Sequence, residues 1–221
     1  MPDAEISSNP TPLDSDVAVL IRKRPKPGER RVQILQALAA MLEQPGAERI
    51  TTAALAARLD VSEAALYRHF ASKAQMFEGL IEFIEQSVFS LVNQIAEREG
   101  AALASDTGGG ARHAGKVAAM LIQFAERNPG MTRVMVGDAL VFENERLQQR
   151  MNQFFDKIES IFRQSLRGLA HDSGSATPSV DAQVSASVLT AFVVGRLQRF
   201  ARSGFKRLPS EHLEASLAQM L

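Results

Sequence analysis

A run of apolar residues between positions 72 and 97 does most to limit what this chain can fold into. Apolar side chains recur there three or four positions apart, which is the period of one buried face of an α-helix. The stripe consists of Met76, Phe77, Leu80, Ile81, Ile84, Val88, Leu91 and Ile95. Helical spacing returns in further segments, and no convincing alternation of period two is found. The sequence therefore predicts an all-α fold.

Capping and helix-breaking residues set the expected ends of the other helices. We expect Thr51 or Thr52, Ser62, Ser72 and Ser210 to cap helix starts, because a side-chain oxygen there can accept an unpaired backbone N–H. The sequence Asn-Pro-Gly at 128–130 is expected to stop one helix, with a short helix after it. The longer expected helices cover about 28–44, 52–59, 63–69, 73–97, 111–127, 138–168, 180–203 and 210–220.

Composition excludes several classes of protein. The 221 residues include no cysteine, which excludes disulfides and thiolate metal sites. The first residues are acidic and rich in Pro and Ser, and lack the basic start and apolar run of a signal peptide. No apolar stretch is judged long enough to cross a bilayer. We expect a cytoplasmic protein without membrane contact.

Charge is unevenly distributed along the chain. Lys and Arg together number 25, as do Asp and Glu, so the net charge is zero. Residues 1–21 nevertheless hold four acids and no base, whereas residues 22–73 hold ten Lys and Arg against five Asp and Glu. This basic segment predicts an anionic partner for that part of the chain. A solvated basic surface remains an alternative on charge alone.

The same basic segment has the pattern of a helix-turn-helix. Two short helices are joined by a tight turn, and the second is expected to begin at Ser62. Leu55 of the first helix can pack against Leu66 and Phe70 of the second. In such motifs the start of the second helix enters the major groove of DNA, while flanking groups contact phosphates.

Polar side chains around the second helix suit this role. Tyr67, Arg68, His69 and Lys73 can donate hydrogen bonds or charge to phosphate oxygens, which fixes the docking register without reading bases. The alternative, that Tyr67 and His69 are ordinary polar residues at a helix end, stays open. The predicted DNA-contacting residues are Thr51, Thr52, Ser62, Glu63, Ala64, Ala65, Tyr67, Arg68, His69 and Lys73.

The stretch ITTAALAARLDVSEAALYRHFASKAQMFEGL (50–80) resembles the DNA-binding domain of the TetR family, which ends in a Tyr-x-His-Phe-x-x-Lys pattern. The likeness continues through LIEFIE (80–85), ERNPG (126–130) and a F-E-x-x-R-L-Q-x-R pattern (142–150), and covers about residues 28–221. An acidic N-terminal extension, an SDTGGG insertion and Asp60 in place of a turn glycine depart from the family pattern. Asp tolerates a positive φ better than most residues, so the turn is expected to survive.

The resemblance implies a TetR-like domain organisation. We expect a disordered extension at 1–27, a three-helix DNA-binding head at 28–73, and a helical body for dimerisation and partner binding at 74–221. Small residues four apart in the helix expected at 180–203 favour close packing against a second copy, although a helix buried within one monomer is a competing interpretation. A dimer is favoured because two heads about one helical turn apart read a palindrome. The predicted dimer residues are Val184, Ser187, Val188, Ala191, Phe192 and Gly195.

The resemblance is strongest to a branch of the family that acts in nucleoid occlusion. It implies that dimers bound to palindromic chromosomal sites, with room for more than one dimer per site, bind FtsZ and inhibit assembly of the division ring over the nucleoid. The FtsZ tail that the resemblance implies is acidic and apolar, so a groove beside an exposed Arg suits it. The candidate contacts are Phe83, Met120, Gln123, Arg127 and Asn128. A core position for Phe83 and a helix-capping role for Asn128 stay open as alternatives.

Other functions have less support in the sequence. We find no catalytic set, so we expect no enzyme. His113 and His171 are isolated from ligand-spaced carboxylates, so we expect no metal site and no cofactor. A ligand-responsive TetR-type transcriptional repressor is the alternative function.

Overall fold

The computed structural model describes residues 28–44, 50–103, 108–172 and 174–221. The extension at 1–27 and the first half of the SDTGGG insertion, 105–107, therefore lie outside the described residues. No strand occurs in the described part of the chain, which confirms the all-α prediction. Its elements are α1 (Glu29–Leu42), α2 (Thr52–Arg58), α3 (Glu63–Tyr67), α4 (Lys73–Leu103), α5 (Gly109–Arg127), α6 (Pro129–Met135), the 3₁₀ turn η1 (Asp138–Leu140), α7 (Glu145–Asp172), α8 (Pro178–Arg202) and α9 (Leu213–Met220).

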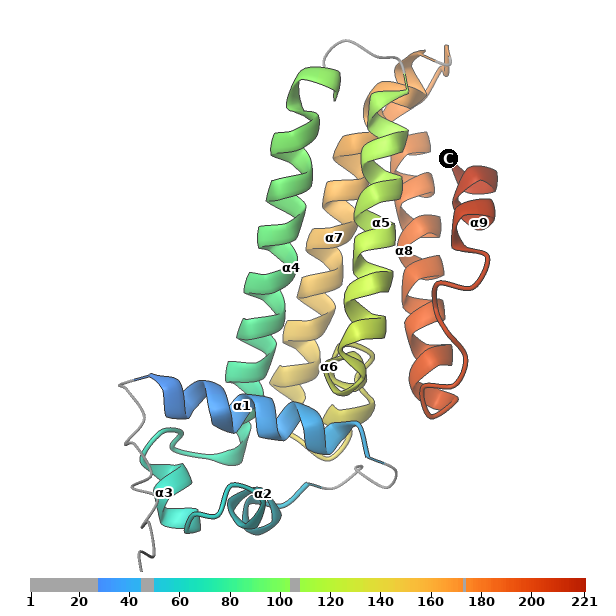
Figure 1. Ribbon diagram of the computed structural model, residues 1–221. Helices are drawn as coiled ribbons and strands as arrows, with labels where there is room; N and C mark the ends of the chain where they lie inside the picture. Colours follow the sequence, from blue (N-terminus) through green and yellow to red (C-terminus); the bar gives the residue numbers. More distant parts are fainter. Residues whose placement is uncertain (1–27, 45–49, 104–107, 173) are drawn as a thin grey trace, which may run out of the picture.

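The helices form two groups, which we call the head (α1–α3) and the body (α4–α9). Figure 1 shows α4, α5, α7 and α8 side by side in a bundle, with α9 beside α8 and the head below the N-terminal end of α4. Gly130 at the start of α6 joins the two groups. A Cβ added there would overlap the carbonyl oxygen of Ala39 in α1, so only glycine permits this close approach.

The head has a small core built from its three helices. Leu55, Leu66 and Phe70 are almost fully buried, as the sequence predicted. The turn between α2 and α3 holds Asp60 at a φ of 53°, in the left-handed region that the sequence predicted for this position.

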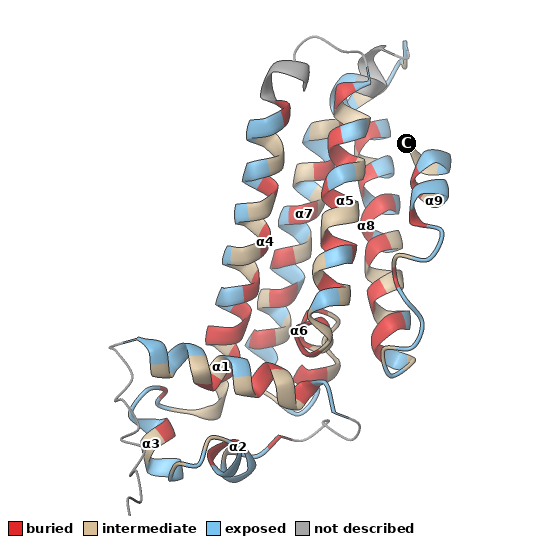
Figure 2. Ribbon diagram, viewed as in Figure 1, coloured by how far each residue is buried: buried red, intermediate tan, exposed pale blue. Residues whose placement is uncertain are grey.

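The body has a larger core, visible as the buried faces of its long helices in Figure 2. Phe77 on α4 and Phe154 and Phe162 on α7 are almost fully buried. The predicted stripe on α4 faces this core over most of its length, from Met76 to Val88. Phe83 on α4 and Val184 and Val188 on α8 stay outside this core and are exposed.

Two helix starts differ from the sequence prediction. The helix expected at 138 begins at Glu145 instead, because Gly137 takes a φ of 84° and the chain forms η1 and a turn first. Asn144 then accepts a hydrogen bond from the Arg146 N–H at 3.1 Å and caps α7. The last helix begins at Leu213 rather than at a cap on Ser210, and its flanking residue His212 has a φ of 54° and no side-chain cap.

The expectation that no segment could cross a membrane was wrong for α8. Among the described residues, this one helix is long and apolar enough by length and composition alone. One face of α8 packs into the bundle through Leu189, Val193 and Leu197. The opposite face adds exposed valines, so two apolar faces together raise the hydropathy of the helix.

Candidate nucleic-acid interface and partner surfaces

The helix-turn-helix is held by hydroxyl caps at the start of both its helices. Thr51 Oγ1 accepts a hydrogen bond from the Ala54 N–H at 3.1 Å, and Ser62 Oγ accepts one from the Ala65 N–H at 3.3 Å. Both caps were predicted. They fix the direction of α2 and α3 through contacts only three residues apart.

Thr52 and Glu63 join the starts of the two helices. The Thr52 hydroxyl donates to a Glu63 carboxylate oxygen at 2.6 Å. Glu63 occupies the first turn of α3, where a negative charge is favourable to the helix dipole. Ala64 is exposed beside it and Ala65 is half-buried, so the backbone of α3 is uncovered at its N-terminal end.

The predicted phosphate-binding residues at the other end of α3 are exposed. Tyr67 keeps 45% of its surface accessible, and Arg68 and His69 are exposed next to it. Arg68 has no ion-pair partner among the residues that the structure describes. A phenol, a guanidinium and an imidazole thus lie together on one end of the head, and all three can donate hydrogen bonds to an anion.

Arg31 supports this end of α3 and was missed by the sequence analysis. Its guanidinium donates to the His69 carbonyl oxygen at 3.0 Å and lies 4.1 Å from the centre of the Phe70 ring. A charged guanidinium on an aromatic face and on a helix C-terminal carbonyl is favourable on both counts. The two residues are 38 positions apart, so local spacing gave no signal of the contact.

Lys73 is placed differently from the other predicted phosphate-binding residues. Its ammonium forms an ion pair with Glu143 at 2.5 Å and lies 5.7 Å from the centre of the Phe77 ring. Two further ion pairs join α4 to α7: Arg146 with Glu78, and Arg150 with Glu85 at 2.6 Å. The hydrogen bond that the Arg150 guanidinium donates to Glu85 raises the pKa of Arg150, against the opposing effect of burial.

The predicted partner residues lie on two neighbouring helices of the body. Phe83 on α4 is 42% exposed and so lies outside the core. On α5, Gln123 and Arg127 are exposed and Met120 is half-buried against the core. The two helices lie side by side and run in opposite directions (Figure 1).

Asn128 has a structural contact of its own. Its side-chain amide donates to the Phe124 carbonyl oxygen at 2.7 Å, which closes the end of α5. This is the capping role that the sequence left open as the alternative to partner binding. Asn128 is half-buried, and its side-chain oxygen Oδ1 remains a candidate hydrogen-bond acceptor for a partner.

The outer face of α8 exposes the predicted dimer residues. Val184 and Val188 are 57% and 52% exposed, and Val180 one turn earlier is exposed as well. Ser187 and Ala191 are exposed too, while Phe192 and Gly195 are half-buried. A Cβ added at Gly195 would meet nothing within 4 Å, so no neighbour in the same chain requires glycine there.

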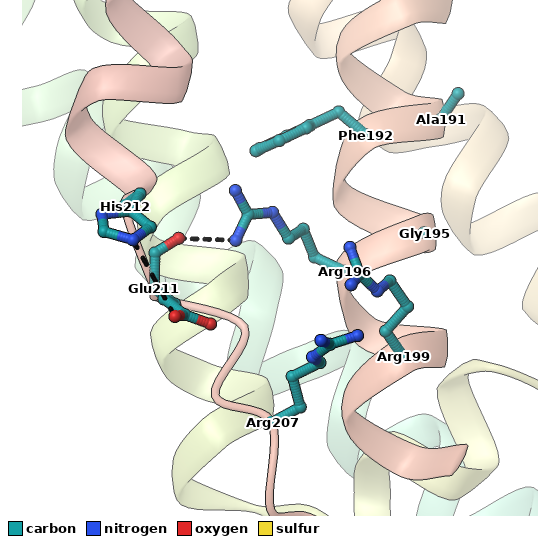
Figure 3. A pocket seen from close by; sticks show the side chains of 8 residues that line it. All are labelled: Ala191, Phe192, Gly195, Arg196, Arg199, Arg207, Glu211 and His212. Carbon is teal, nitrogen blue, oxygen red and sulfur yellow. Dashed lines mark hydrogen bonds and ion pairs between the residues drawn. The ribbon is translucent and has the colours of Figure 1, made fainter. Parts of the chain in front are cut away.

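A basic pocket borders this face of α8 (Figure 3). It has a volume of about 510 Å³ and lies between α8 and the segment before α9. Arg196 crosses it, stacks on Phe192 at 4.9 Å and donates to the Glu211 carbonyl oxygen at 2.6 Å. Arg199 and Arg207 complete its basic lining. Through its bond to Glu211, Arg196 links the segment before α9 to α8.

The body also contains one buried polar cluster, at the end away from the head. His113 Nδ1 lies 2.8 Å from the Ser165 hydroxyl, which donates to the Ile161 carbonyl oxygen, so His113 is the donor to Ser165. Burial lowers the pKa of His113, opposed by the nearby Glu99 carboxylate. Glu99 pairs with Lys116. No group of three or more metal-ligating residues occurs in the described part of the chain.

Comparison with known proteins identifies relatives over both parts of the chain. Residues 34–80 match the model of bacterial regulatory proteins of the tetR family, and residues 113–221 match a tetracyclin repressor-like C-terminal domain of the SlmA-like type. The nucleoid occlusion factor SlmA of Aliivibrio fischeri strain MJ11 is 53% identical over 85% of this chain and 92% of its own length. That of Vibrio cholerae is 53% identical over 84% of this chain and 90% of its own.

Solved structures show the same fold at low sequence identity. The fatty acid degradation regulator FadR of Bacillus halodurans has a TM-score of 0.68 and is 13% identical, covering 89% of this chain and 96% of its own. A TetR-family regulator of Mesorhizobium loti has a TM-score of 0.60 and is 18% identical, covering 90% and 98%. These likenesses support the helical architecture alone.

Proposed function

Because this chain belongs to the TetR family, and within it to the SlmA-type nucleoid occlusion factors, we propose that its DNA-bound dimer binds FtsZ and inhibits assembly of the division ring over the nucleoid. The chain is a dimeric DNA-binding protein of that type. The protein is then cytoplasmic and associated with the nucleoid. The observation that carries the proposal is the separation of two surfaces: uncovered hydrogen-bond donors on the head, and an exposed Phe83 and an exposed Arg127 on two neighbouring helices of the body.

The head binds DNA through the exposed end of α3 and the caps around it. Tyr67, Arg68 and His69 contact phosphates, and the uncovered start of α3 at Ala64 approaches the bases of a palindromic half-site. Exposure of these side chains supports the assignment. Further DNA contacts come from the starts of α2 and α3. The hydroxyls of Thr51, Thr52 and Ser62 and the carboxylate of Glu63 add polar contacts to DNA, and Ala65 adds a contact next to that of Ala64.

Two copies of α8 form the dimer in an antiparallel arrangement. A two-fold axis places the same face of each copy against the other, so each large side chain needs a small one opposite. If the axis passes between positions 189 and 190, every predicted interface residue has such a partner. This register pairs Val184 with Gly195, Ser187 with Phe192, and Val188 with Ala191. The exposed valines of α8 support it, because burial against a second copy removes apolar surface from water.

FtsZ binds at the outer faces of α4 and α5. Phe83 and Met120 supply apolar contact, Arg127 attracts the acidic tail, and Gln123 and the free side of Asn128 add hydrogen bonds. An apolar anchor beside a cation suits an acidic and apolar peptide. The exposure of Phe83 and Arg127 on neighbouring helices supports this site.

A binding assay with and without DNA tests the proposal. A DNA duplex is first selected from a randomised pool by the wild-type protein; we refer to it as the selected duplex. Purified FtsZ is then titrated against the free protein, the protein on the selected duplex, and the protein with a scrambled duplex. We expect the tightest FtsZ binding on the selected duplex. Absence of binding at tens of micromolar FtsZ, roughly −6 kcal/mol, would remove FtsZ as the partner and leave DNA binding intact.

A further inference from the structure

Lys73 is a cation of the predicted DNA surface that is paired with a carboxylate of the body. We propose that Glu143 holds the Lys73 ammonium against the body in the free protein and yields it to a DNA phosphate on docking. Glu143 is then a positioning residue that sets DNA affinity from outside the head. The proposal rests on the DNA-binding part of the proposed function, and specifically on contact between Lys73 and phosphate.

The contacts of the Lys73 ammonium carry the argument. Lys73 is the first residue of α4, directly after the head. Its ammonium lies near the Phe77 ring, one turn further into the body, and on Glu143, which precedes α7. The ammonium is therefore held by residues of the body and not by the head. An ammonium in this position cannot at the same time lie on a phosphate at the DNA-facing end of α4.

The pair is accessible enough to exchange. The Lys73 side chain is 29% exposed and that of Glu143 is 11% exposed, so the lysine is the more accessible partner of the pair. The neighbouring acids on α4 are occupied, because Glu78 pairs with Arg146 and Glu85 with Arg150. A phosphate thus competes with one carboxylate for Lys73. A partly exposed ion pair changes an equilibrium constant only a few-fold, so a DNA phosphate can displace Glu143 from Lys73.

A mutant cycle on the selected duplex tests the exchange. Affinity is measured between about 50 and 200 mM salt for the wild type, Glu143→Gln, Lys73→Ala and the double variant. We expect Glu143→Gln to tighten binding about two- to fivefold with the salt slope unchanged, because the phosphate no longer competes with a carboxylate. We expect Lys73→Ala to weaken binding and to lower the log–log slope by about 0.9. In the Lys73→Ala background, Glu143→Gln should have no effect.

Glu85→Gln is the matched control, because it removes the same charge from an ion pair further along α4. It should leave DNA affinity unchanged. The proposal is overturned if Glu143→Gln weakens binding or leaves it unchanged, if its effect persists without Lys73, or if Glu85→Gln tightens binding equally. A silent Lys73→Ala in a wild-type background that binds the duplex also overturns it, while the proposed function stands. Failure of the wild type to bind any selected duplex would instead defeat the proposed function.

Discussion

The head and the body use their positive charges in opposite ways. In the head, Arg58 and Arg68 are exposed and have no ion-pair partner among the described residues. In the body, Arg146, Arg150 and Lys116 each pair with a carboxylate of α4. These three body cations join helices of the body, whereas Arg58 and Arg68 of the head remain available to an outside anion.

Large exposed apolar side chains are found mainly on the body and not on α2 and α3 of the head. The body exposes Val184 and Val188 on α8 and Phe83 on α4, while the large apolar side chains of α2 and α3 are turned inward, with Tyr67 as the exception. A surface with free cations suits a polyanion, and apolar patches suit proteins. The difference supports the proposal that DNA binds the head and protein partners bind the body, and variants of each region can test that division.

The largest effect is expected from the dimer face. Gly195→Leu should separate the two copies of α8, because the added side chain meets Val184 of the partner in the proposed register. No neighbour within the same chain is displaced. We expect a monomer by analytical ultracentrifugation. Affinity for the selected duplex should fall about a hundredfold or more, because the two heads no longer bind the two half-sites as one linked unit.

Two further variants make this test specific. Gly168→Leu places the same side chain on α7, at another glycine with nothing within 4 Å, and should remain dimeric. The exchange of Val184→Gly with Gly195→Val should restore the dimer that Gly195→Val alone weakens, because the large and small residues merely change places. A Gly195→Leu variant that stays dimeric with full DNA affinity would put residue 195 outside the interface.

A crossed pair of charge variants is expected to have the next largest effects. Arg68→Ala should weaken DNA binding about tenfold and lower the salt slope by about 0.9, while FtsZ binding at saturating duplex is retained. Arg127→Glu should abolish FtsZ binding by repulsion of an acidic tail, with DNA affinity nearly unchanged. Both affinities are measured for both variants, with circular dichroism to establish that each is folded.

Either half of this cross can fail independently. If FtsZ binds Arg127→Glu as well as it binds the wild type, the partner site lies elsewhere on the body. If Arg68→Ala lowers FtsZ binding even at saturating duplex, the head and the body do not divide the two partners between them.

The head could be predicted from sequence because its structure rests on local contacts. The caps at Thr51 and Ser62 act over three residues, and the turn at Asp60 depends on the φ of one residue. Signals of this kind are present in the sequence itself. The apolar stripe of α4 and the Asn-Pro-Gly stop after α5 were predictable for the same reason.

The contacts of Arg31 and Lys73 that were missed are distant in sequence. Arg31 reaches His69 over 38 positions, and Lys73 reaches Glu143 over 70. Lys73 was therefore predicted as a free cation. The start of α7 was placed too early, because the apolar period at 138–144 is shared by a 3₁₀ turn that Gly137 imposes. The two faces of α8 were likewise indistinguishable from a uniformly apolar helix until its neighbours were known.

A smaller effect should distinguish local from tertiary support of the helices. Ser62→Ala removes the cap of the five-residue helix α3, and Ser72→Ala removes the equivalent cap of α4, where Ser72 Oγ accepts from the Gln75 N–H at 3.2 Å. Each loses about 1 kcal/mol of local support. We expect amide hydrogen exchange to accelerate in α3 for Ser62→Ala, and hardly at all in α4 for Ser72→Ala, because the bundle holds α4. Equal acceleration in both helices would contradict this difference.

The smallest effect is expected from pH, and it should arise in the body. Burial lowers the pKa of His113 below its ordinary 6.5, so the unfolded chain binds more protons than the folded chain as the pH falls below that value. Stability is therefore complete above pH 6.5 and declines as the pH drops through and below it. His113→Asn keeps a donor for Ser165 without a titrating ring, and should flatten this decline in thermal unfolding between about pH 7.5 and 5.5. His69→Asn, an exposed histidine of the head, is the matched control and should leave the decline as in the wild type. A decline that persists in His113→Asn would have to come from other groups, and the buried cluster would not distinguish the body from the head.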